Sequence, residues 1–281
     1  MSKLFIATQH CIPQHFMTGV VYRLTRSRSP AFKNWLIGSF MRGFHPDMSD
    51  AVEPNPLAYA SFNEFFTRPL RDDARPIVKD ERSLISPVDG TVSQLGPIDS
   101  TQILQAKGRN YSLDALMAGN GEWAPRFRGG SFATLYLAPY NYHRIHMPLT
   151  GTLVAAWYVP GKLFSVNQVT AASVDNLFAR NERVVCVFDG AHGPFVLALV
   201  GATIVGSMAT VWHGVVNPPR PGRVREWRYD DAPVVLKQGE EMGRFLLGST
   251  VVLLFPGALG FNPAWAPGGA IRLGEVMATR A

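Results

Sequence analysis

The chain has 281 residues, of which 47% are hydrophobic and 17% charged, so it can bury a substantial core and is too apolar for a disordered protein. Its 27 Lys and Arg residues against 21 Asp and Glu give a net charge of +6, and residues 1–45 carry six of those cations and no acidic residue. The two cysteines, Cys11 and Cys186, are far apart in sequence, which excludes a disulfide framework and favours a reducing compartment.

The basic N-terminal segment contains two predicted helices. Apolar residues recur at helical spacing over residues 16–24, and a second, more broadly apolar pattern covers residues 31–42. Cations interleaved with aliphatic side chains indicate an anionic lipid surface rather than nucleic acid, because no nucleic-acid-binding motif follows. The alternative is that both helices simply pack on the body. We expect residues 1–60 to form an amphipathic helical region that associates with a membrane.

No segment is expected to cross a membrane. The longest apolar stretch, residues 195–206, is too short to span a bilayer and is interrupted by Gly201. The apolar run after Lys3 is also too short for a secretory signal. Any attachment to a membrane is therefore expected to be peripheral.

The pattern changes after residue 60. Ser61 is a candidate N-cap for a short helix with Glu64 at its third position, and residues 69–76 have the composition of a solvated linker. From Leu84 onward, short β-prone runs separated by Gly, Pro, Asn and Asp predict antiparallel strands at residues 91–93, 132–137, 152–158, 184–188, 195–205, 234–236 and 250–255. The expected fold class is α+β, with a helical N-terminal region on a mostly antiparallel β body, and residues 61–281 as the catalytic domain.

Three places in the β body carry chemically reactive side chains. Asp89 lies in a turn framed by Pro and Gly, His143 and His146 lie three residues apart, and Ser249 precedes the last long strand. An Asp, a His and a Ser can act as orienting group, base and nucleophile. The two histidines could also bind zinc, but no third ligand is evident nearby, so no metal site is predicted. A general base beside a second acid or phosphate contact is a better use of the pair.

These motifs together resemble those of bacterial phosphatidylserine decarboxylase in its proenzyme form. The resemblance runs in order along nearly the whole chain, except for the first sixty or so residues and the tail from Asn262. The matching segments are residues 62–66 (FNEFF), 87–90 (PVDG), 142–148 (YHRIHMP), 161–167 (GKLFSVN), 176–183 (NLFARNER), 199–203 (LVGAT), 241–245 (EMGRF) and 247–250 (LGST).

The resemblance implies a self-cleaving precursor. Asp89 would orient His146, which would take the proton of the Ser249 hydroxyl so that it attacks the Gly248 carbonyl. Glycine suits this position because it tolerates strain and leaves the carbonyl approachable. Elimination from the resulting ester would leave a β chain of residues 1–248 and an α chain of residues 249–281, with Ser249 converted to a pyruvoyl group.

The implied reaction is the decarboxylation of phosphatidylserine to phosphatidylethanolamine in phospholipid biosynthesis. The substrate amine would condense with the pyruvoyl ketone as a Schiff base, and His143 would act as the acid or contact the lipid phosphate. The expected location is peripheral, on the cytoplasmic face of the cell membrane. The expected partners are phosphatidylserine, an anionic membrane surface and the two chains of one precursor, with a homodimer as a candidate assembly. A serine hydrolase and a non-enzymatic membrane scaffold are the rival interpretations.

Overall fold

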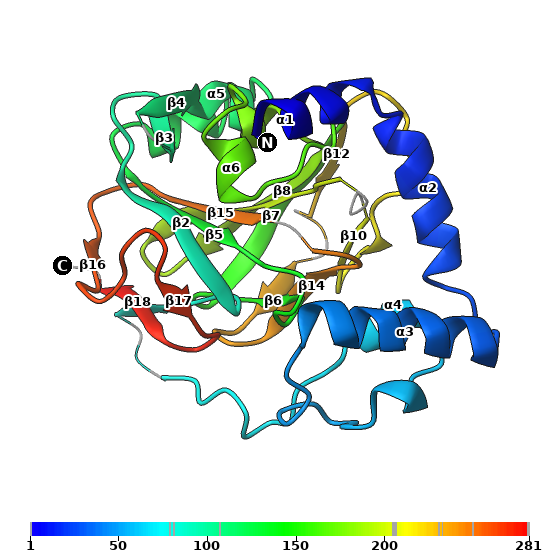
Figure 1. Cartoon of the computed structure of the whole chain (residues 1–281). Helices are drawn as coiled ribbons and strands as arrows, with labels where there is room; N and C mark the ends of the chain where they lie inside the picture. The colour runs from blue at the N-terminus through cyan, green and yellow to red at the C-terminus, as the bar shows by residue number, and fades with distance from the viewer. Residues whose placement is uncertain are drawn as a thin grey trace.

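The computed structural model describes residues 2–279 apart from positions 79, 81, 107, 204–206, 230, 232 and 249. Side chains are described from residue 6 onward, except for that of residue 11. Three helices at the N-terminus, α1 (Ser2–Cys11), α2 (Gln14–Leu24) and α3 (Pro30–Phe44), run around the outside of a β body (Figure 1). The two predicted helices are confirmed as α2 and α3.

Helix α1 has no counterpart in the predictions. Its residues lack a clear apolar face, and tertiary contacts hold it in place: Ile6 packs on the core of the body and the Gln9 side chain accepts a hydrogen bond from the Ser165 amide at 2.7 Å. Tertiary packing commonly stabilises a helix whose own sequence is a weak helix signal.

Helix α3 packs with the short helix α4 (Phe62–Phe66) in a cluster of aromatic and aliphatic side chains. The predicted cap of α4 is confirmed, because the Glu64 amide donates to Ser61 Oγ at 3.2 Å. A 3₁₀ turn, η1 (Pro56–Ala58), connects the two helices. Since Leu247 also packs on this cluster, the helices lie against the segment that precedes the last long strand.

The main sheet has nine strands, and its strands pair antiparallel. In spatial order they are β12 (Arg225–Arg228), β7 (Gly151–Val159), β8 (Arg183–Gly190), β9 (Gly193–Val200), β15 (Thr250–Phe255), β5 (Ser131–Tyr136), β2 (Gly90–Pro97) and β17 (Ala270–Ile271), with β13 (Val234–Leu236) also on β7. The predicted α+β class with a mostly antiparallel β body is confirmed. The strand predicted over residues 195–205 is too long, because β9 ends at Val200 and the next amide, of Gly201, donates to Glu182.

Strand β15 is buried on both faces of this sheet. Val251, Leu253 and Phe255 belong to one apolar cluster, whereas Val252 and Leu254 belong to another on the opposite face. This double burial explains why the strand is a continuous apolar run instead of an alternating pattern.

Smaller sheets and short helices complete the body. One sheet joins β11 (Gly214–Val215), β10 (Met208–Thr210), β14 (Glu241–Phe245) and β6 (Arg144–His146); another joins β1 (Ser83–Ile85), β18 (Val276–Thr279) and β16 (Gly260–Phe261); and β3 (Gln102–Ala106) pairs with β4 (Arg109–Ser112). The short helices are α5 (Leu113–Leu116), η2 (Ala124–Phe127), α6 (Gln168–Ala171) and α7 (Leu177–Arg180). The pairing of β6 with β14 brings the histidine motif beside the chain that leads to Gly248.

Candidate active site

Gly248 lies where the chain passes from β14 to β15, and a histidine closes the space beside it. A Cβ atom added at Gly248 would lie 2.8 Å from His143 Nε2 and 3.4 Å from the Leu137 carbonyl oxygen. A side chain at this position would collide with the His143 ring, so the ring or the backbone would have to shift. The predicted nucleophile, Ser249, lies outside the described residues.

His143 is fully buried and has a defined tautomer. Its ring packs on Phe66 with the ring centroids 4.1 Å apart, and Nδ1 lies 2.8 Å from the Asn141 carbonyl oxygen. Since a carbonyl can only accept, Nδ1 carries the proton and Nε2 presents a lone pair. Within the described part of the chain, nothing hydrogen-bonds to Nε2.

Burial sets the charge of His143. It lowers the pKa of His143 to about 3; the Asn141 hydrogen bond opposes this shift, and the nearby Arg68 charge adds to it. The ring is thus neutral at pH 7 and can accept a proton at the nitrogen that faces Gly248.

His146 is held differently, between two partners. Its Nδ1 lies 2.7 Å from the Gly239 carbonyl oxygen, so the Tyr142 hydroxyl, 3.0 Å from Nε2, donates to that nitrogen. Burial lowers the pKa of His146, although the Gly239 hydrogen bond opposes this shift, and burial raises the pKa of Tyr142. His146 is therefore also neutral, but its basic nitrogen is already occupied by a phenol that keeps its proton.

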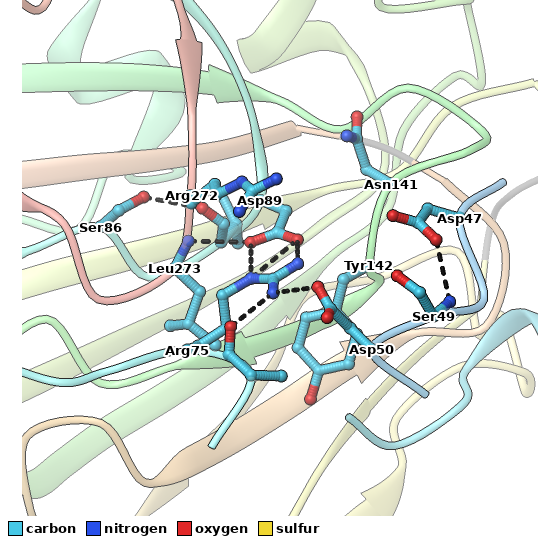
Figure 2. A network of polar contacts seen from close by, with 12 residues as sticks. Asp47, Ser49, Asp50, Arg75, Ser86, Asp89, Asn141, Tyr142, Arg272 and Leu273 are labelled. Carbon is cyan, nitrogen blue, oxygen red and sulfur yellow. Dashed lines mark hydrogen bonds and ion pairs between the residues drawn. The ribbon is translucent and has the colours of Figure 1, made fainter. Parts of the chain in front are cut away.

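Asp89 is buried in an ion-pair network. Its carboxylate accepts from Arg75 Nε at 2.9 Å and Arg75 Nη2 at 2.6 Å, and from the Leu273 amide at 2.8 Å (Figure 2). Arg75 also donates to Asp50 at 2.7 Å. No hydrogen bond joins Asp89 to His146, both of which the structure describes, so the orienting contact implied by the resemblance is absent from this conformation.

Two cavities lie near these residues. One, of about 260 Å³, is polar and is lined by Asp89, Arg75, Asp50 and Tyr142 among others. The other, also of about 260 Å³, contains Gly248 and is lined mainly by apolar side chains from α3, α4 and the body: Phe40, Phe44, Phe66, Tyr136, Leu137, Pro139, Val166, Ala202 and Leu247. Asp89 and Gly248 thus border different cavities.

Sequence reasoning found the histidines and the aspartate but missed their partners. Arg75 lies within the expected solvated linker, yet its side chain is only 12% exposed because it pairs with Asp50 and Asp89. The composition of that segment indicated an exposed linker, and no local sequence signal links Arg75 to Asp89. Tyr142 precedes His143 in the motif, so its position was a signal that could have been used.

The described residues hold no group of three or more His, Cys, Asp or Glu side chains close enough for a metal ion. Among the described residues, a buried neutral histidine presents an unpartnered nitrogen toward a backbone glycine at the wall of an apolar cavity, which suits an enzyme that moves a proton on an apolar substrate.

Comparisons with known proteins define the family. A family model described as phosphatidylserine decarboxylase matches residues 62–279, and a second, described as PSD, matches residues 4–45. The chain therefore belongs to the phosphatidylserine decarboxylase family, as the sequence motifs predicted.

Similar proteins named phosphatidylserine decarboxylase proenzyme span almost the whole chain. The protein of Azoarcus sp. (strain BH72) is 59% identical over 276 residues, which cover 98% of this chain and 95% of that protein. The protein of Albidiferax ferrireducens is 58% identical, over 98% of this chain and 97% of that protein. The protein of Delftia acidovorans is 55% identical, over 99% of this chain and 98% of that protein.

Proposed function

We propose that this chain is synthesised as a proenzyme, cleaves itself between Gly248 and Ser249, and then decarboxylates phosphatidylserine to phosphatidylethanolamine. Its family and the proenzyme names of its relatives support the proposal. The structural observation that carries it is the close approach of His143 Nε2 to Gly248, where an added Cβ atom would lie only 2.8 Å from that nitrogen.

Asp89, His146 and Ser249 are the residues proposed for self-cleavage. The Ser249 hydroxyl must lose its proton to attack the Gly248 carbonyl carbon, and a neutral histidine can accept that proton. His146 would have to exchange its hydrogen bond from Tyr142 for one from Ser249, whereas His143 Nε2 already faces Gly248. His143 is therefore a second candidate base for cleavage, in addition to its predicted role in decarboxylation.

A pyruvoyl group derived from Ser249 is the proposed cofactor. The residues present fit such a group, because an apolar cavity and His143 Nε2, which has no hydrogen-bond partner among the described residues, flank the neighbouring residue, Gly248. The ketone supplies an electron sink when carbon dioxide leaves. His143 would hold and return a proton at Nε2, and Phe66 and Leu137 would exclude water from the reacting atoms.

Peripheral membrane attachment is part of the proposal. Helix α2 buries its polar residues Gln14 and Thr18 and exposes its apolar residues Phe16, Val20 and Leu24. A helix whose apolar side faces away from the protein supports contact with lipid, and we place that contact on the cytoplasmic face of the cell membrane. Among the described helices, none has the length and apolarity needed to cross a membrane.

The test combines a mass measurement with an activity assay. The purified protein should separate into two fragments, residues 1–248 and 249–281, whereas the Ser249→Ala variant should remain one chain near 30.9 kDa. The processed protein should release carbon dioxide from phosphatidylserine and lose this activity after borohydride reduction with substrate. A single uncut chain with esterase activity would instead identify a serine hydrolase.

His143 and His146 can be separated in the same assay. If His143→Ala still cleaves itself but does not decarboxylate, His143 serves only the second reaction. If His143→Ala remains uncut and His146→Ala is processed, the base for cleavage is His143 and the predicted role of His146 is wrong.

A further inference from the structure

A third cavity, of about 350 Å³, lies where α1 meets α2, away from Gly248 and Asp89. Lys162 and Phe164 also line it. The side chains that can carry charge here are His10, His15 and Lys162, and none of the lining residues is acidic. The cavity therefore favours an anion.

One buried hydrogen-bond donor in this cavity lacks an acceptor among the described residues. Gln9 lines it and is only 5% exposed, and its Nε2 has no hydrogen-bond partner in the described part of the chain. Its other amide atom, Oε1, is fixed by the Ser165 amide at 2.7 Å, which determines where Nε2 lies. A buried amide donor without an acceptor is costly, so a ligand oxygen would stabilise it.

The first turn of α2 also borders the cavity. The Gln14 amide donates to the Ile12 carbonyl oxygen at 2.8 Å, and the Met17 amide donates to that of Pro13 at 3.1 Å. The N-cap is Pro13, which provides no side-chain cap, and the first turn contains no acidic residue. The first amide groups of a helix and its dipole favour an anion at this end. His15 lies in the same turn and also lines the cavity.

Phe16 identifies the source of the anion. Its side chain is 72% exposed, lines the cavity, and begins the apolar stripe that continues through Val20 to Leu24 on α2. A ligand here thus has hydrocarbon contacts beside its anionic group. A phospholipid has both parts, whereas free phosphate has only one.

We propose that the α1–α2 cavity binds the phosphate of an anionic phospholipid at the membrane surface, through Lys162, His10, His15, Gln9 Nε2 and the first turn of α2. This proposal rests on the peripheral membrane attachment proposed above. The site is separate from the Gly248 cavity but shares a loop with it, because Lys162 and Phe164 line one cavity and Ser165 and Val166 line the other.

The first test compares two variants that each remove one positive charge. Lys162→Gln changes the cavity, whereas Arg23→Gln changes an exposed position on α2 outside it. Binding of the full-length protein to phosphatidylcholine vesicles with and without phosphatidylglycerol is measured by co-sedimentation. Each variant should bind vesicles that contain phosphatidylglycerol a few-fold more weakly, because each loses one positive charge that attracts the anionic surface. The affinity of Lys162→Gln for these vesicles should fall about tenfold further, since this variant also loses a charged hydrogen bond to the lipid phosphate. Equal losses in the two variants would overturn the proposal.

The second test changes the buried amide. Gln9→Glu keeps an oxygen for the Ser165 amide and places a carboxylate where Nε2 lies, so it should abolish the phosphatidylglycerol-dependent part of binding. Asn34→Asp adds the same charge on α3 outside the cavity and should retain most of that part. Thermal unfolding of each variant shows whether it is folded; a folded Gln9→Glu protein that binds like Asn34→Asp would contradict the site.

Soluble ligands distinguish the two sources of phosphate. Chemical shifts of His10 and His15 are followed as inorganic phosphate is added without vesicles. Binding of inorganic phosphate that requires Lys162, together with equal vesicle losses in the two charge variants, would assign the cavity to a free anion and overturn the lipid source. Decarboxylation of a soluble short-chain phosphatidylserine is measured separately. If the protein is inactive in that assay but Lys162→Gln still weakens vesicle binding more than Arg23→Gln does, only the proposed enzymatic activity is contradicted.

Discussion

At the scale of single residues, the site depends on how closely His143 approaches Gly248. Gly248→Ala should slow self-cleavage about 100-fold, because the added methyl group would displace the His143 ring or the scissile carbonyl by a substantial fraction of an ångström. The fraction of cleaved chain over time, measured by mass spectrometry, tests this. Gly43→Ala is the control, since no atom lies within 4 Å of its added Cβ, and it should be processed at the normal rate. Normal processing of Gly248→Ala would show that the His143 contact is not needed.

The Arg75 network makes a different prediction, about stability. Arg75→Met leaves the buried Asp89 carboxylate without its ion partner, so the free energy of unfolding should fall by about 3–5 kcal/mol. Arg71→Met is the matched control: its ion pairs with Asp50 and Asp73 are more exposed, and the expected loss is below about 1 kcal/mol. Urea unfolding of both variants in the uncut Ser249→Ala background measures the difference. Equal losses would mean that the Asp89 pair contributes no more than a surface pair.

The same network marks the limit of sequence reasoning at this scale. Asp89, His143 and His146 were found because their local motifs are distinctive. The partner of Asp89 lies 14 residues earlier in a polar segment, and the pairing depends on how the chain folds back rather than on spacing. The resemblance also implied contact between Asp89 and His146, which in this conformation have other partners.

At the scale of elements, the periodicity of α2 predicted its two faces but not which face packs on the body. The prior expectation for an amphipathic helix is an apolar face turned inward. The structure shows the reverse, because Gln14 reaches the Leu163 amide at 2.7 Å and thereby fixes the polar side against the loop. Contacts distant in sequence, such as this one and the bond from the Asn63 amide to the Thr25 carbonyl, fix the orientation of the helix. Strand β15 is the opposite case, since a run of six apolar or β-branched residues was sufficient to predict a buried strand.

The exposed face of α2 should contribute directly to lipid binding. Phe16→Ser and Leu24→Ser should each reduce partitioning into lipid vesicles about tenfold or more, because each removes an apolar side chain that would be buried in the bilayer surface. Val235→Ser is the control: Val235 is 58% exposed but lies on β13 of the body. Partitioning is measured by co-sedimentation with neutral vesicles, which removes the contribution of charge. Equal effects at all three positions would contradict a membrane-facing role for α2.

At the scale of the whole molecule, the fold class and the longer strands could be predicted from the β-prone runs, but not the two faces of the sheet or the short strands β6 and β14. The division at residue 60 stays a prediction. The cluster that joins α3, α4 and Leu247 crosses this boundary, so the helical region and the site segment share packed side chains. A change in the N-terminal helices can therefore reach the residues around Gly248 through direct contacts.

The buried histidines should make the stability of the whole fold depend on pH. Burial lowers the pKa of His143 to about 3, from about 6.5 in an unfolded chain, so between these values the unfolded chain binds one more proton than the folded protein. Stability therefore rises with pH in this window and falls as pH drops below about 6.5, by about 1.4 kcal/mol per pH unit from His143. His146 acts in the same direction, because burial lowers its pKa as well. The measurement is the urea unfolding free energy of the Ser249→Ala chain at pH 7 and pH 5. His143→Gln in that background removes one of the two groups and should reduce the difference between the two pH values; an unchanged difference would mean that His143 is not kept neutral by burial.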